Sequence, residues 1–220
     1  MKTLAVTIAT SSLALSLVAS GYGQSVNRLD PTESGLGIQA EIQTQTALTR
    51  EEAAGLLFIR EEEKLAQNVY SFLAKKWGPR PFGNILQAEA AHTAWVSALL
   101  KKYEITDPSA SLPPGKFADP TLQKLYNEFE KKGSISRIEA LKVGVTIEEM
   151  DLFDLSRWAK TTNRADLQQV YENLARGSRN HLRAFVRNLS NAGFTYKPKH
   201  ISQEEFNKVI SSQNERGRGF

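Results

Sequence analysis

Apolar residues recur at intervals of three and four along most of the chain, which is the spacing of one face of an α-helix. This pattern predicts four long helices, at about residues 50–77, 82–103, 145–161 and 165–192. Shorter helical segments are expected near 120–132, 135–143 and 202–212, with Gly144 separating the second from the long helix that follows. No useful length of sequence alternates apolar and polar residues, so the predicted fold class is all-α, a bundle of four long helices with short accessory ones.

The first and last predicted helices begin with the same local signature. Thr49 is followed three residues later by Glu52, and Ser202 by Glu205. In this arrangement each side chain hydrogen-bonds the backbone N–H of the other residue, which satisfies two donors at the helix start. The helical domain is therefore expected to span residues 49–210, and residues 211–220 to form a loose tail.

The first 23 residues have the layout of a secretory signal peptide. Lys2 precedes an apolar stretch from Leu4 to Val18, and small residues follow, with cleavage expected between Ser20 and Gly23. A membrane anchor is the alternative, but this run is short for one and is interrupted by Thr and Ser. Residues 24–48 are polar and read as a flexible segment. The sequence therefore predicts a secreted or periplasmic protein with no membrane attachment after cleavage.

Composition narrows the chemistry available to the protein. The 220 residues carry a formal charge of +4, and the basic residues are scattered without an accompanying aromatic stripe, which argues against a nucleic-acid partner. The chain has no cysteine, so it has no disulfides and no thiolate ligands. Any bound metal must be held by carboxylate oxygen and imidazole nitrogen.

Each of the four long helices directs an acid or a histidine onto its apolar face. A carboxylate on such a face is costly to bury unless it is paired or bound to a metal. The position of each residue follows from the turn of about 100° per residue in an α-helix. The predicted metal ligands, in chain order, are Glu62, Glu89, His92, Glu148, Asp151 and His181.

Ordinary structural roles explain some of these residues equally well. A solvated charge run accounts for Glu61 and Glu63, although Glu63 also lines up with apolar positions of its helix. Thr146 and Glu149 can form a helix-capping box that places Glu148 in a first helical turn. A lone histidine on an apolar face, such as His181, is more often a hydrogen-bonded core residue than a ligand.

Three further candidate ligands are Glu63, Glu149 and Ser178. Ser178 lies one turn before His181, where a second Glu is expected in a carboxylate-bridged two-metal bundle, and Asp151 is a candidate to replace it. Tyr70 and Tyr103 are expected near the site, as a source of a proton or an electron.

Four separated motifs in the same order carry a resemblance to a known family. They are REEEKLAQNVY, FGNILQAEAAHTAW, IEEMDLFDL and GSRNHLRAF. So spaced, they resemble the ferritin-like family catalogued as domain of unknown function 2202, over roughly residues 48–210. The resemblance implies a ferritin-like four-helix bundle, more distantly similar to rubrerythrin and bacterioferritin. Ser178, in place of a glutamate, departs from the ferritin pattern.

Two classes of function are compatible with the sequence. In the first, the buried acids and histidines bind one or two Fe or Mn ions, or Zn, without an organic cofactor, and the site oxidises or detoxifies dioxygen or peroxide. In the second, the same residues form a structural polar network in a non-enzymatic interaction module outside the cytoplasm. Iron storage is disfavoured because it needs a cage of many subunits. The sequence does not select the metal, and it is compatible with a homodimer as well as a monomer.

Overall fold

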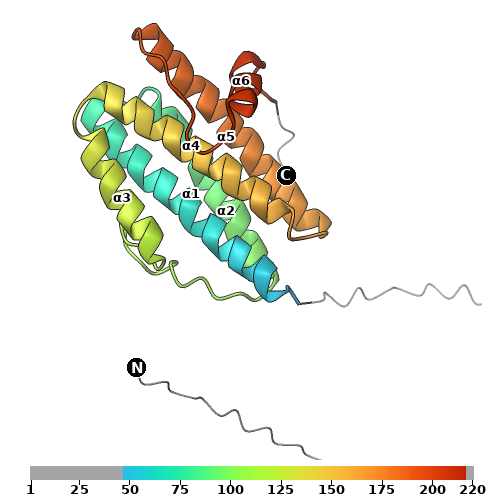
Figure 1. The fold of residues 1–220 in the computed structure, drawn as a ribbon. Helices are drawn as coiled ribbons and strands as arrows, with labels where there is room; N and C mark the ends of the chain where they lie inside the picture. The colour runs from blue at the N-terminus through green and yellow to red at the C-terminus, as the bar shows by residue number, and fades with distance from the viewer. Residues whose placement is uncertain (1–46, 217–220) are drawn as a thin grey trace, which may run out of the picture. The chain divides into compact units, whose positions relative to one another are not determined.

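The computed structural model describes residues 47–216, which contain six helices and no strand (Figure 1). The helices are α1 (Arg50–Trp77), α2 (Phe82–Lys102), α3 (Pro120–Gly133), α4 (Arg137–Ala159), α5 (Ala165–Asn191) and α6 (Gln203–Ser211). The all-α prediction is confirmed for this part of the chain. The predicted signal peptide and residues 24–46 of the polar segment lie outside the described residues. None of the described helices is long and apolar enough to cross a membrane.

The four long helices pack in pairs. α1 lies along α2 and α4 along α5, while contacts between α1 and α4 and between α2 and α5 join the two pairs (Figure 1). The short helix α3 packs on α1 and α4, and α6 packs on α5. One side of α1 is therefore covered by an accessory helix that lies outside the four long ones.

Two apolar clusters fill the interior on either side of a polar layer. On α1 one cluster reaches Ile59 and the other starts at Leu65. On α5 the first cluster ends at Leu174 and the second starts at Leu182. The acids and histidines of the motifs fall between these apolar positions. Burial of the two clusters supplies the stabilisation, and the polar residues are held between them.

The start of α1 agrees with the sequence, whereas the start of α4 does not. Thr49 and Glu52 form the predicted reciprocal capping box. The prediction of a separate helix after Gly144 is wrong, because α4 runs without interruption from its N-cap Ser136. Gly144 instead allows α4 to approach α5 closely, since a β-carbon at this position would lie 2.5 Å from the ring of Phe185. The capping box predicted for Thr146 and Glu149 is consequently absent from the middle of α4.

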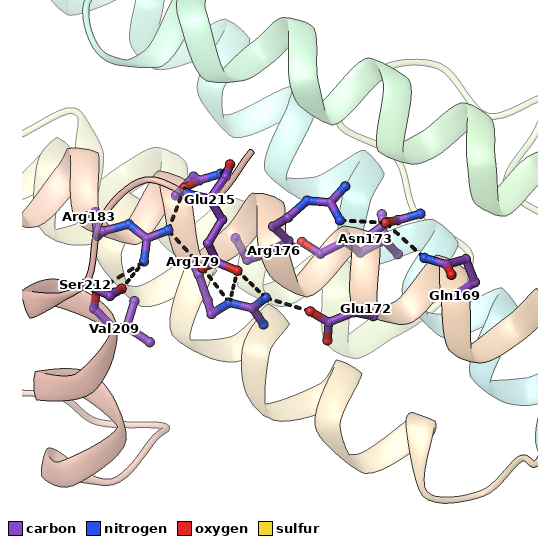
Figure 2. A network of polar contacts seen from close by, with 12 residues as sticks. Gln169, Glu172, Asn173, Arg176, Arg179, Arg183, Val209, Ser212 and Glu215 are labelled. Carbon is purple, nitrogen blue, oxygen red and sulfur yellow. Dashed lines mark hydrogen bonds and ion pairs between the residues drawn. The ribbon is translucent and has the colours of Figure 1, made fainter. Parts of the chain in front are cut away.

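The described part of the C-terminal segment is held against α5 rather than loose. Glu215 forms an ion pair with Arg179, with Nη2 and Oε2 2.6 Å apart, and a second one with Arg183 at 3.0 Å (Figure 2). The Glu215 backbone also exchanges hydrogen bonds with the Asn180 side chain. Residues 212–216 therefore follow α6 back onto the outer side of α5.

Candidate metal centre

Glu89 lies at the middle of α2 and contacts a different histidine with each carboxylate oxygen. Its Oε2 lies 2.9 Å from Nδ1 of His92, one turn further along α2. Its Oε1 lies 2.8 Å from Nδ1 of His181, which comes from α5. The two imidazole rings are stacked with their centroids 5.7 Å apart. A single carboxylate, 1% exposed, thus joins two histidines from neighbouring helices.

A second carboxylate approaches each histidine from another helix. Glu63 of α1 places Oε2 3.2 Å from His92 Nδ1, and Glu148 of α4 places Oε2 3.5 Å from His181 Nδ1. Two buried groups result, Glu63–Glu89–His92 and Glu89–Glu148–His181, and within each group the ligand atoms lie within 4.8 Å of one another. All four long helices contribute to this cluster.

The second group is not satisfied by internal hydrogen bonds. Glu89 Oε1, Glu148 Oε2 and His181 Nδ1 are all buried, and in the described structure none has a hydrogen-bond partner despite their proximity. The contacts of His181 with the two carboxylates are ion pairs. Three buried ligand atoms that converge without bonding one another match what a metal ion requires of its ligands, so the residues fit a bound cation.

In the first group, His92 satisfies part of the hydrogen-bonding capacity of the two carboxylates. His92 Nδ1 hydrogen-bonds with both Glu63 and Glu89. Burial lowers the pKa of His92, but the adjacent charge of Glu63, together with Glu89, raises it to about 11. Burial likewise lowers the pKa of His181, and the charges of Glu89 and Glu148 raise it to about 10. In the metal-free protein both rings are therefore in the positively charged imidazolium form at neutral pH.

The pKa values of the three carboxylates shift in different directions, depending on the neighbours of each. Burial raises the pKa of Glu63 to about 8, although the charge of His92 opposes this shift. Burial also raises the pKa of Glu148. For Glu89 the two protonated histidines outweigh burial and hold its pKa well below the usual range. The shared carboxylate thus stays ionised.

Two neighbours fix the orientation of the ligands. The hydroxyl of Tyr70, on α1, donates to Glu148 Oε1 at 2.5 Å, which leaves Oε2 toward His181. Gly177, on α5, lies against the His92 ring, where a β-carbon would come within 2.5 Å of Nε2. Tyr70 is thus near the centre, as the sequence predicted. The sequence analysis did not predict the contact of Gly177 with the His92 ring, although a glycine in the middle of a helix was the available signal.

Glu62 and Asp151, predicted as ligands, fall outside both groups. They are buried, 3% and 4% exposed, and line a small space between α1, α3 and α4. The helical turn explains the difference between neighbouring residues of α1. Glu63 points about 100° away from Glu62, toward α2 and its histidine.

Other candidates have ordinary partners. Glu149 is fully buried and accepts hydrogen bonds from the Tyr196 hydroxyl and the Lys199 backbone N–H. The Ser178 hydroxyl donates to the carbonyl of Leu174 in its own helix. The Tyr103 hydroxyl lies at the end of α2 and donates to Asp166. Each of these contacts accounts for its residue without a metal.

The interpretation of Glu61 as a solvated charge is wrong. Glu61 is 5% exposed and accepts hydrogen bonds from the backbone N–H groups of Ala118 and Asp119. The neighbouring Lys64 donates to the carbonyls of Ser109 and Leu112. The charge run of α1 therefore anchors the segment between α2 and α3, and at the same time its Glu63 contacts His92 in the cluster.

Comparison with known proteins identifies the family. Residues 52–213 match the family model described as "Uncharacterized protein domain (DUF2202)". The chain belongs to this family. It is 48% identical over 170 residues to the uncharacterized protein MJ0754 of Methanocaldococcus jannaschii, which covers 77% of this chain and 92% of that protein.

A solved structure agrees in shape. The crystal structure of hypothetical protein MJ0754 from Methanococcus jannaschii DSM 2661 matches this DUF2202 chain with a TM-score of 0.76 and 46% identity. The match covers 78% of this chain and 98% of that one. Membership of the DUF2202 domain family, expected from the four motifs, is thus confirmed.

Proposed function

We propose that this protein is an exported, ferritin-like metal-binding protein whose helical interior holds two divalent ions. The observation that carries the proposal is the position of Glu89 between two histidines, with one carboxylate oxygen toward each. In this arrangement Glu63, Glu89 and His92 would hold one ion, and Glu89, Glu148 and His181 would hold the other. Export rests on the signal-peptide pattern of residues 1–23.

The ligand types favour iron or manganese, with zinc as the remaining option. Carboxylate and imidazole suit all three metals, and affinity alone does not choose among them. Two-metal carboxylate bundles use a Glu from each of two helices and Glu-x-x-His from each of the other two. Here Glu63 and Glu148 match the single glutamates, Glu89 with His92 matches one motif, and Ser178 with His181 is the second motif without its acid.

The substitution of serine for glutamate bears on the reaction. With Ser178 bonded to its own helix, the α5 side of the centre supplies one carboxylate fewer than the two-metal pattern contains. Iron or manganese held there would supply redox chemistry toward dioxygen or peroxide. The chain's own contribution is to keep Glu89 ionised, to hold Glu148 through Tyr70, and to exclude water by burial.

One observation favours the alternative of a non-enzymatic interaction module. His92 hydrogen-bonds both of its carboxylates, so this half of the cluster is a satisfied ion-pair network without a metal. Under this alternative the protonated His181 pairs by charge with Glu89 and Glu148 in the second half.

Elemental analysis of protein purified without chelators and then offered Fe²⁺, Mn²⁺ and Zn²⁺ separates the two functions. The wild type is expected to retain about two ions per chain, and Glu89→Gln to retain none, because it removes the shared ligand. Glu149→Gln is the matched control, since Glu149 is equally buried but bonded to Tyr196 and Lys199. A wild type that binds none of the three metals supports the interaction module. Consumption of peroxide by the metal-loaded wild type, but not by Glu89→Gln, tests the redox activity.

A further inference from the structure

We propose that a pocket between the end of α5 and the segment after α6 binds a phosphate-bearing anion through Arg183, Arg187 and Arg216. The three arginines line this pocket together, and its volume is about 1060 Å³. Such a volume is at the upper end of the range for small-molecule sites. None of the lining residues belongs to the candidate metal centre, so the inference goes beyond the proposed metal-binding function and does not depend on it.

One side of α5 forms the first wall of the pocket. Arg183, Val186, Arg187 and Ser190 all line it. Residues three and four apart are neighbours on a helix surface, so these side chains share one side of α5. Arg183 and Arg187 are separated by about 6 Å along the helix axis. Two guanidinium groups therefore come from adjacent turns of the same wall.

The segment after α6 forms the second wall and carries the third arginine. Glu215 of this segment pairs with Arg179 and Arg183 of α5 (Figure 2). These ion pairs hold residues 212–216 against α5, and the residue after Glu215, Arg216, lines the pocket. Glu215 thus brings a third positive charge to a pocket that it does not line itself.

The lining contains no acid that could balance these charges. Arg187 and Arg216 form no hydrogen bond or ion pair with any residue between 47 and 216. Like charges around one pocket repel one another, whereas an anion between them is attracted to all of them. The planar guanidinium donates two parallel hydrogen bonds to a phosphate group. The other polar residues of the lining are uncharged and can donate further hydrogen bonds: Ser190, Asn191, Ser212, Gln213 and Asn214.

Arg183 is fixed in place by the chain itself. Its side chain is 5% exposed. Nη1 donates to the Val209 carbonyl and to the Ser212 hydroxyl (Figure 2). Nη2 donates to Asn180 and Glu215. Nε is buried and has no hydrogen-bond partner in the described part of the chain. The guanidinium is therefore pre-organised, which lowers the entropy cost of binding, and it keeps a donor that the chain does not use.

Charge and shape together favour a phosphate over a carboxylate ligand. A phosphate group carries a charge of about −1.5 to −2 at neutral pH, whereas a carboxylate carries a single negative charge. Val186 and Ile210 add an apolar part to the wall, which suits the carbon skeleton of an organic phosphate. A soluble diphosphate and the phosphate headgroup of a lipid present the same chemistry, and two binding measurements distinguish these sources.

Titration calorimetry of the metal-free full-length protein with pyrophosphate measures the soluble source. Arg187→Gln and Arg216→Gln should each bind at least about tenfold more weakly than the wild type, because each loses charged hydrogen-bond donors to the anion. Arg187→Lys keeps the charge but not the planar fork, so its affinity should fall between those of the wild type and Arg187→Gln. Circular dichroism confirms that each variant is folded.

Sedimentation with vesicles of phosphatidylcholine that contain phosphatidic acid measures the lipid source. Vesicle binding that is weakened in both glutamine variants, without binding of pyrophosphate, assigns the phosphate to a lipid headgroup. Pyrophosphate binding that is weakened in both variants assigns it to a soluble ligand. Either result supports the pocket.

Arg50→Gln is the control, because it removes one positive charge from an exposed arginine at the other end of α5. Arg50 begins α1 close to Glu52, which pairs with Arg164 at the start of α5. About 29 Å of helix separates Arg164 from Arg183. The control should bind pyrophosphate and vesicles as the wild type does.

Equal binding by Arg187→Gln, Arg216→Gln and the control in both measurements would show non-specific attraction to positive charge and overturn the proposal. Absence of binding by the wild type in both measurements would overturn it as well. Both measurements use metal-free protein, so neither failure bears on the proposed metal-binding function.

Discussion

Gly177 of α5 lies against the imidazole of His92 on α2, with no room for a β-carbon between them. The smallest possible side chain at this position would come within 2.5 Å of His92 Nε2. The absence of a side chain at residue 177 therefore determines where the His92 ring lies, and with it one half of the candidate centre.

Gly177→Ala is expected to weaken metal binding about tenfold or more, as loss of ligand orientation commonly does. The added methyl group displaces the His92 ring from Glu63 and Glu89. Alanine favours the helix by about 0.5–1 kcal/mol, so the helix itself is not weakened. Titration calorimetry with Mn²⁺ measures the effect. Ser178→Ala, one residue further, is the control, and equal affinities in the two variants would contradict the role of Gly177.

Tyr70→Phe removes the hydroxyl that donates to Glu148 Oε1. A buried acceptor left without its donor costs about 1–3 kcal/mol, so the metal-free protein should lose stability by that amount. Urea denaturation with circular dichroism measures this loss. Saturating Mn²⁺ should restore part of the stability, because the metal then holds Glu148. An unchanged unfolding midpoint would show that the hydrogen bond does not contribute.

The charge run of α1 predicts two separable defects. Glu63→Gln should lower the metal-to-protein ratio because Glu63 contacts His92. Glu61→Gln should keep the metal-to-protein ratio. It should speed hydrogen exchange at the backbone N–H groups of Ala118 and Asp119, which donate hydrogen bonds to the Glu61 carboxylate. Elemental analysis and exchange mass spectrometry distinguish these results. Loss of metal in both variants would show that the run acts as one unit.

The stability of the metal-free protein should fall as pH rises. The pKa values of His92 and His181 are about 11 and 10 in the folded state, above the value near 6.5 in an unfolded chain. Their contribution is fully present below pH 6.5 and is lost as pH rises through 10 and 11. Glu63, with a folded pKa of about 8, acts in the same direction between about pH 4.5 and 8.

Metal binding should show the opposite trend, because an ion must displace the protons of both histidines. Urea denaturation between pH 6 and 8, with and without Mn²⁺, measures the two trends together. Stabilisation by Mn²⁺ is expected to grow with pH while the metal-free protein weakens. The double variant His92→Gln/His181→Gln should flatten the metal-free profile. A flat profile in the wild type would contradict the assigned protonation of the rings.

Helix positions and four of the clustered residues followed from the sequence because both depend on local periodicity. Glu89, His92, Glu148 and His181 lie at or near the middle of apolar faces, and such faces converge in a helical interior. The same reasoning misplaced Gly144, since a glycine that separates helices and one that lets helices touch look alike in a sequence.

The environment of α1 could not be predicted in this way. Residues 61–66 are all buried, because α3 and the segment before it cover the side of α1 that a four-helix pattern leaves exposed. Which of three consecutive glutamates faces which neighbour depends on this long-range packing. Glu63 was therefore assigned a secondary place, although it contacts His92, and Glu61 was assigned to solvent.

Anomalous diffraction from crystals soaked in Mn²⁺ shows directly whether the helical interior binds metal. Two manganese peaks are expected there, one beside Glu63 and His92 and one beside Glu148 and His181, with Glu89 between them. Data at the manganese edge distinguish these peaks from bound water. An interior without manganese peaks, with His92 still bonded to Glu63 and Glu89, would contradict the account and leave a structural polar network in its place.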